Sequence, residues 1–203
     1  MTLTQEKERY TYADYLGWDE DFRAEIIDGA LYVSEPPATY HQDISMNLSL
    51  KIGNFLAGKP GKVYAAPFGV RLFPQEDHSD KTVLEPDLVV ICDTSKLDER
   101  GCNGAPDMVI EILSPSTARK DVLYKFYKYL RAGVREYWVV DPDTETVQVN
   151  LLEHDRYTTQ TYRGFDPETM DEADRQYAQE SIPVLVLPGL VIDFKTIFAG
   201  KNY

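Results

Sequence analysis

The spacing of apolar residues predicts two amphipathic helices. From Tyr40 to Ala57 the apolar positions follow a helical period, and Gly58 ends the segment. A second helical pattern runs from about 118 to 132 and stops at Gly133. The stripes expected to face a core are Ile44, Leu48, Ile52 and Phe55, supported by Met46 and Leu50, in the first helix, and Val122, Leu123, Phe126, Tyr129 and Leu130 in the second.

Short runs of β-forming residues predict strands before, between and after these helices. The dipeptide Asp28-Gly29 lies between two such runs and indicates a hairpin over 22–34. Further strands are expected at 62–74, with a bend at Pro67 and Gly69, and at 84–92, 105–114, 134–141, 146–153 and 156–163. A strand and a short helix are expected within 181–198.

The order of these elements predicts an α/β fold with a mixed sheet (α+β mixed). The helix at 118–132 connects the strands at 105–114 and 134–141, which should therefore be parallel neighbours. A length of 203 residues fits a single domain over 1–203. Its expected parts are an N-terminal hairpin at 22–34, a catalytic core at about 40–141 and C-terminal strands at 145–198.

Charge and composition limit the choice of partner and compartment. The net charge is −13, which repels nucleic acid at long range, so DNA binding would need a local basic surface or a metal ion that neutralises carboxylates. No run approaches the roughly 20 apolar residues of a membrane span, and the polar N-terminus predicts no secretory signal, so a cytoplasmic location is expected. Cys92 and Cys102 lack CxxC spacing and are interpreted as reduced structural thiols.

Two carboxylates interrupt the strongest apolar runs. Asp87 opens one run, and Glu111 stands in the middle of another. Alternation places Asp107, Val109 and Glu111 on one face of the strand at 105–114. A buried, unpaired glutamate is costly, so we expect Glu111 to face a cation, a metal ion or a cleft, the alternative being a strand with one wet face.

Asp107 competes with Asp87, because each follows a proline. Four residues of extended strand separate Asp107 from Glu111 by about 13 Å, which is too far to share one ion. Asp87 is therefore the preferred partner of Glu111, and Asp107 is interpreted as a residue that begins its strand.

Other side chains could join these carboxylates. Lys125 flanks the apolar stripe of its helix, so its amine can reach the end of the sheet, whereas Lys128 is expected to point further outward. Glu25, in the first arm of the hairpin, could point into a pocket, but a solvated position is preferred. His41 begins the first helix and is typical of a structural hydrogen-bonding residue rather than a ligand or base.

These residue types suit magnesium chemistry. Mg²⁺ prefers oxygen ligands and keeps several waters, so two or three carboxylates can form a site. If their strands pair, Asp87 and Glu111 could converge on one ion, with the Ile112 backbone carbonyl completing the shell. The ion would lower the pKa of a bound water, and a nearby lysine would stabilise charge on a phosphate or orient the water.

An ordered series of motifs resembles one family over most of the chain, from about Tyr10 to Phe198. The motifs are EIIDG, PPATYHQ, EPDLVV, GAPDMVIEILSPST, DVLYKFYKY and AGVREYWVVDP. This series resembles the Uma-two family of endonucleases, which is similar to restriction endonucleases of the PD-(D/E)XK superfamily. The resemblance implies a restriction-endonuclease-like fold, with a central mixed β-sheet flanked by helices and extra β-hairpins.

The resemblance also implies roles for individual residues. Asp87 matches the aspartate of the PD element, and Glu111 matches the acidic residue of (D/E)XK. Leu113 stands where the pattern has its lysine, so the lysine role is assigned to Lys125 on the following helix. The further residues that match the family are Asp121 and Tyr129, which frame Lys125, and Glu25 and His41.

The implied activity is hydrolysis of DNA phosphodiester bonds with Mg²⁺, or Mn²⁺ as a substitute, by a homodimer. Two other functions stay open. The net charge and Leu113 favour a catalytically degenerate binding or assembly protein of the same fold. A metal-dependent hydrolase acting on a small phosphorylated substrate would also suit an acidic surface, although the sequence has no Gly-rich phosphate loop.

Overall fold

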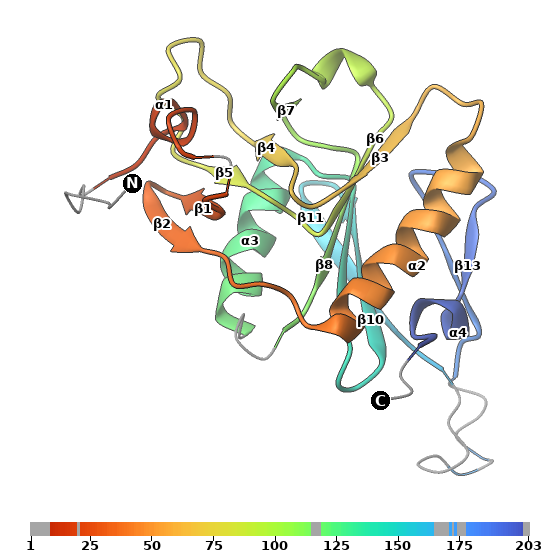
Figure 1. Cartoon of the computed structure of the whole chain (residues 1–203). Helices are drawn as coiled ribbons and strands as arrows, with labels where there is room; N and C mark the ends of the chain where they lie inside the picture. The colour runs from red at the N-terminus through yellow and green to blue at the C-terminus, as the bar shows by residue number, and fades with distance from the viewer. Residues whose placement is uncertain are drawn as a thin grey trace.

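A six-stranded mixed sheet forms the centre of the structure, a computed structural model (Figure 1). The structure describes residues 9–19, 21–114, 119–164, 171, 173 and 178–200, without the side chains of residues 119–122. The strand order is β11-β10-β9-β8-β6-β3. The strands are β3 (Lys62–Ala65), β6 (Leu88–Ile91), β8 (Met108–Ile112), β9 (Glu136–Asp141), β10 (Thr146–Glu153) and β11 (Arg156–Arg163). The β8–β9 pair is parallel, as the sequence predicted, and the other pairs are antiparallel.

Helices cover both faces of this sheet. In Figure 1, α2 (Thr39–Leu56) lies on one face and α3 (Arg119–Ala132) on the other. Strands β8 and β9 are rich in β-branched and aromatic residues and are buried almost throughout, as expected for strands covered on both sides. The even residues of β8 pack toward α2, and Val109 packs toward Tyr129 of α3.

A second, five-stranded sheet packs on the α3 side. Its order is β2-β1-β5-β4-β7. The strands are β1 (Ala24–Ile27), β2 (Ala30–Val33), β4 (Gly69–Arg71), β5 (Val83–Leu84) and β7 (Gly101–Asn103), with α1 (Tyr12–Tyr15) beside them. The predicted hairpin is confirmed as β1–β2, and both turn residues, Asp28 and Gly29, have positive φ angles of 52° and 85°.

The C-terminal segment packs beside α2. It contains β12 (Ser181–Pro183), β13 (Val191–Asp193) and α4 (Phe194–Ile197). Asn47 of α2 donates to the carbonyls of Ile197 and Ala199 and fixes this arrangement. None of the described helices is long and apolar enough to cross a membrane.

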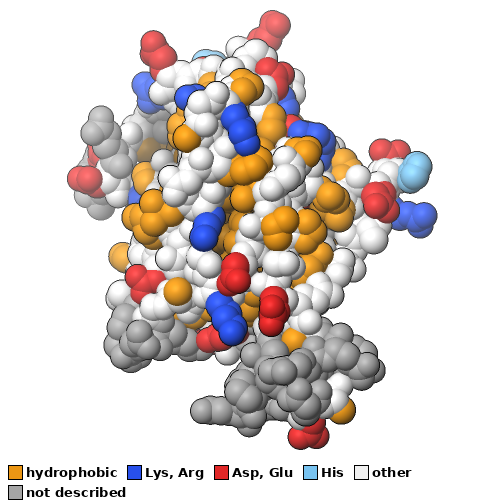
Figure 2. Space-filling view, turned by 90° about the vertical axis from the view of Figure 1, so that its right-hand side faces the viewer, with side chains coloured by type: hydrophobic (Ala, Val, Ile, Leu, Met, Phe, Trp, Pro, Cys, Tyr) orange, Lys and Arg blue, Asp and Glu red, His pale blue; other side chains and the backbone are white. Residues whose placement is uncertain are grey.

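Three residues of the predicted apolar stripes are exposed, which corrects the sequence interpretation. Met46, Leu50 and Leu123 are 59%, 55% and 60% exposed. In α2 the buried positions are Ile44, Leu48, Ile52 and Leu56, spaced by four, so positions two residues away lie on the opposite side of the helix. Figure 2 shows the α2 and C-terminal face, where apolar side chains reach the surface.

Two predicted strands are each divided between the sheets. The segment at 84–92 breaks at 85–87, so that β5 joins the five-stranded sheet and β6 the central one. The segment at 62–74 divides at Pro67 into β3 and β4. The loop that follows β6, expected to be irregular, contains a 3-10 helix (η1, Thr94–Lys96) and β7. These breaks place Asp87 where the chain passes from one sheet to the other.

Candidate active site

Asp87 and Glu111 lie at the same end of the central sheet. Strands β6 and β8 pair with Leu88 opposite Ile110, so the same register places Asp87 opposite Glu111. Asp87 Oδ2 accepts a hydrogen bond from the Ile112 backbone N–H at 2.7 Å. The sequence-based hypothesis required these two strands to pair, and the structure pairs them.

Lys125 lies between two carboxylates. Its Nζ is 3.0 Å from Glu111 Oε1 and 2.8 Å from Glu25 Oε1. The hydroxyl of Tyr129, one turn further along α3, donates to Glu111 Oε1 at 2.6 Å. The side chains of Glu25, Glu111 and Lys125 are each only 10–12% exposed. Lys125 of α3 therefore contacts Glu111, the residue whose partner lysine the sequence motif would place at position 113.

The cluster carries more negative than positive charge. Asp87, Glu111 and Glu25 provide three carboxyl groups, and Lys125 is the cation between two of them. Burial raises the pKa of Glu111, the charge of Lys125 lowers it, and the charges of Asp87 and Glu25 raise it further. The net effect raises the pKa of Glu111 to about 7. Burial also lowers the pKa of Lys125, but Glu111 and Glu25 outweigh that effect and raise it, so the amine stays protonated. A bound cation would relieve the excess negative charge.

His41 contacts the other side of Asp87. Its Nε2 lies 3.3 Å from Asp87 Oδ1, and its side chain is 11% exposed. Burial lowers the pKa of His41, but the hydrogen bond and charge of Asp87, the Ile112 backbone and Glu111 together raise it. Within the described part of the chain, His41 Nδ1 is buried without a hydrogen-bond partner. The structure thus places His41 directly beside the candidate site.

Two sequence interpretations near the site are wrong. Glu25 is not solvated, because β1 packs under α3 and directs its carboxylate to Lys125. Lys128 does not point outward. Its side chain is 10% exposed and its Nζ lies 2.5 Å from Asp28 at the hairpin turn. Lys125 and Lys128 therefore attach α3 to two acidic residues of one hairpin.

Asp107 is kept away from the cluster. Its Oδ2 accepts from the Cys92 backbone N–H, and its Oδ1 accepts from Arg135 at 2.6 Å. Burial raises the pKa of Asp107, but these two hydrogen bonds and the charges of Arg135 and Lys96 together outweigh it and lower the pKa. This placement agrees with its interpretation as a residue that begins a strand. The side chain of Asp121 lies outside the described residues.

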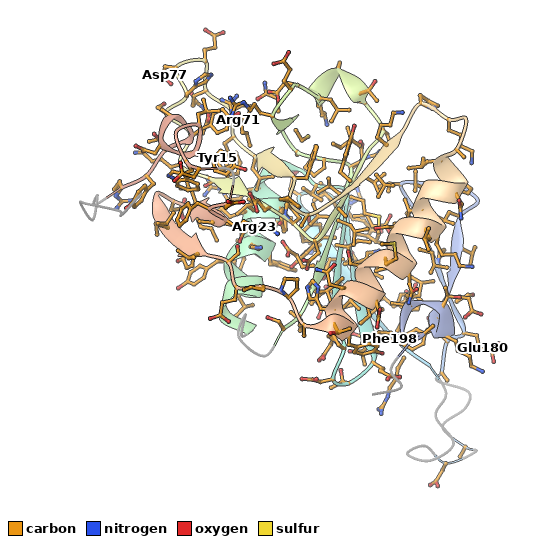
Figure 3. The ribbon with its side chains drawn as sticks, in the orientation of Figure 1. Tyr15, Arg23, Arg71, Asp77, Glu180 and Phe198 are labelled. Atoms are coloured by element: carbon orange, nitrogen blue, oxygen red, sulfur yellow. The ribbon has the colours of Figure 1, made fainter. Side chains whose placement is uncertain are left out.

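Glu85 belongs to the surroundings of the site but had no distinguishing signal in the sequence. Its backbone N–H donates to Glu25 Oε1 at 2.8 Å. Its carboxylate accepts from Tyr15 at 3.0 Å and from Arg23 at 3.1 Å, and Figure 3 shows these two residues on the same side of the molecule, next to β1 and β5. Glu85 thereby connects α1 and the hairpin to the carboxylate cluster.

The donors fit a hard divalent cation. Asp87, Glu111 and the Ile112 carbonyl offer oxygen atoms, which Mg²⁺ prefers, and its remaining positions are usually filled by water. Within the described residues, no three His, Cys, Asp or Glu side chains form a ready-made ligand set. Two carboxylates and a carbonyl would leave several coordination positions for water, as is usual for Mg²⁺.

Fold and cluster together define a mixed α/β protein with an acidic site at one end of its central sheet. The fold is similar to a crystal structure from Anabaena variabilis, described as "a putative nuclease belonging to DUF820", with a TM-score of 0.69, 22% identity, and coverage of 93% of this chain and 97% of that chain. The chain belongs to the Uma2 family, described as "Putative restriction endonuclease", whose model matches residues 12–192.

The chain is 26% identical over 140 residues to the uncharacterized protein slr1290 of Synechocystis sp., and the match covers 68% of this chain and 70% of that protein. The family assignment confirms the resemblance drawn from the sequence motifs.

Proposed function

We propose that the protein is a metal-dependent endonuclease that hydrolyses DNA phosphodiester bonds and uses Mg²⁺, or Mn²⁺ in its place. The observation that carries this proposal is the group of three largely buried carboxyl groups with Lys125 between two of them. Asp87, Glu111 and the Ile112 carbonyl would hold the ion. When bound, the ion supplies Lewis-acid activation of water and of the phosphodiester.

The residues around the ion have separate tasks in this proposal. Because Glu111 and Glu25 keep Lys125 protonated, the amine acts as a cation that stabilises charge on the phosphate and not as a general base. Tyr129 holds Glu111 Oε1 in place, and Glu25 holds the amine. A homodimer would supply two such sites for double-strand cleavage.

Cleavage assays with Asp87→Asn and Asp107→Asn test the proposal. The wild type should cut DNA with Mg²⁺ or Mn²⁺ and stop when a chelator removes the metal. We expect Asp87→Asn to lower cleavage by at least about 100-fold, because a metal ligand is lost. Asp107→Asn is the matched control, since Asp107 also follows a proline and is more deeply buried than Asp87, and it should keep activity within about threefold. Equal losses in the two variants would reject Asp87 as a ligand.

His41→Asn tests the residue that contacts Asp87. Removing a partner of a metal-binding carboxylate commonly lowers metal affinity or activity by about 10–100-fold. We therefore expect weaker Mn²⁺ binding in calorimetry and a matching rise in the metal concentration that gives half-maximal cleavage. An unchanged Mn²⁺ affinity would show that His41 does not position Asp87.

The degenerate binding protein is the alternative. The net charge of −13 and Leu113 support it, and Leu113 packs with the apolar residues between the sheets. Calorimetry distinguishes the two functions, because a nuclease must bind Mg²⁺ or Mn²⁺ through Asp87 and Glu111. Absence of metal binding by the folded wild type would favour the alternative.

A further inference from the structure

An open cleft of about 380 Å³ lies beside the carboxylate cluster. It is formed by the turn between β3 and β4, the loop before β7, and α1. The lining residues used in the argument are Tyr15, Tyr64, Phe68, Glu85, Leu97 and Arg100. Its volume falls within the roughly 300–1,000 Å³ typical of small-ligand sites.

Two stacked aromatic rings form one wall. The rings of Tyr64 and Phe68 are nearly parallel, with an interplanar angle of 7° and centroids 4.3 Å apart. Both side chains are half-buried, so the core holds them in place while they still line the cleft. Held aromatic surfaces of this kind stack nucleobases, because every base has a π-face.

Hydrogen bonds connect the lining of the cleft to the candidate active site. Glu85 lines the cleft, and the Glu85 backbone N–H donates to Glu25 Oε1, the oxygen that also contacts Lys125. On the aromatic side, the Ala66 backbone N–H donates to the Asp87 carbonyl at 3.0 Å. Only one residue separates Glu85 from Asp87, so their Cα atoms are at most about 7 Å apart. A group bound in the cleft would thus lie close to a phosphate at the site.

The charge of the lining selects which part of a nucleotide can enter. Glu85, Asp98 and Glu99 contribute carboxylates, and Arg100 is the single Lys or Arg among the described lining residues. Glu85 is fixed by Tyr15 and Arg23. Such a surface disfavours a phosphate, which needs clustered cations, but accepts an uncharged base whose amino groups can donate to carboxylates.

We propose, building on the nuclease function above, that this cleft binds one unpaired nucleobase of the DNA next to the phosphate that is cut. The base stacks on the Tyr64–Phe68 pair. A base inside a fully paired duplex cannot reach the cleft without being unstacked, which costs a few kcal/mol. The protein therefore prefers DNA with a bulged or single-stranded nucleotide to fully paired DNA.

Binding measurements test the cleft independently of cleavage. The probes are a fluorescent duplex with one bulged adenine and the same duplex with an abasic residue at the bulge. Each probe is titrated with the protein in a buffer that contains a metal chelator. The wild type should bind the adenine bulge about tenfold more tightly than the abasic bulge. In Tyr64→Leu and Phe68→Leu, which keep apolar bulk but lose the aromatic face, this ratio should fall below about threefold.

Phe73→Leu is the matched control. Phe73 is another partly buried aromatic residue of the same apolar cluster, but it does not line the cleft, so its variant should keep the tenfold ratio. Thermal unfolding checks that each variant is folded. Equal affinity of the wild type for the two probes, or an unchanged ratio in both cleft variants, would overturn the proposal. A tenfold ratio without any metal-dependent cleavage would support the cleft and reject the nuclease function.

Discussion

Replacing Lys125 by methionine is expected to lower the free energy of unfolding by about 3–5 kcal/mol at pH 8 without divalent metal. The variant keeps the apolar stem but leaves the carboxylates of Glu25 and Glu111 buried without their cation. Urea denaturation of wild type and variant measures the difference. Added Mg²⁺ should restore part of the loss, because a bound cation replaces the missing charge.

Lys128→Met is the matched control for this prediction. Lys128 lies on the same helix and its side chain is similarly buried, but its partner Asp28 is 69% exposed. Water can therefore solvate the carboxylate of Asp28 when Lys128 is replaced. We expect the free energy of unfolding to fall by at most about 1 kcal/mol. Similar losses in the two variants would contradict the view that Lys125 balances a buried excess of negative charge.

The cost of the Lys125 substitution should also depend on pH. Burial raises the pKa of Glu111, and Lys125 opposes that rise, so removing Lys125 raises the pKa of Glu111 further. A carboxyl group with a raised pKa in the folded state stabilises the fold at low pH, and this contribution is lost as the pH rises through that pKa. The difference from wild type should thus shrink between pH 8 and pH 5.5.

Glu111→Gln is expected to abolish cleavage while leaving the fold intact. We expect a loss of about 10³-fold or more in the rate of DNA cleavage, equal to roughly 4 kcal/mol of transition-state stabilisation. Tyr129 can still donate to the glutamine oxygen, and Glu25 then pairs alone with Lys125. The free energy of unfolding should therefore stay the same or increase. Rates are compared in single-turnover assays and stabilities in urea.

Glu136→Gln provides the comparison for a buried glutamate elsewhere. Glu136 of β9 is completely buried, but it accepts hydrogen bonds from Trp138 and the Val186 N–H and lies outside the cluster. Its variant should cleave DNA at close to the wild-type rate. If Glu111→Gln retained activity within tenfold of wild type, or lost it only because it unfolds, Glu111 would not have the proposed role.

The sequence predicted the central part of the fold because its signals are local. The parallel order of β8 and β9 follows from a helix of predictable length between two apolar runs. The alternation along β8 correctly separated Glu111 from Met108, Ile110 and Ile112. The hairpin followed from its Asp-Gly turn.

The errors concern contacts between distant parts of the chain. The sequence pattern wrongly favours a solvated Glu25, because a short strand gives no sign of the helix that will cover it, and that helix lies 100 residues further on. The helical pattern directs Lys128 outward for the same reason, since its partner Asp28 belongs to the distant hairpin. The cleft between Tyr64 and Arg100 depends on the packing of two loops and has no local pattern.

The most direct test of the metal site is a crystal structure of the protein grown with Mn²⁺ and measured at the manganese absorption edge. We expect one anomalous peak coordinated by Asp87, Glu111 and the Ile112 carbonyl, with Lys125 still beside Glu111. Ordered carboxylates without a peak between them, at a Mn²⁺ concentration that supports cleavage, would show that Asp87 and Glu111 do not hold the catalytic metal ion.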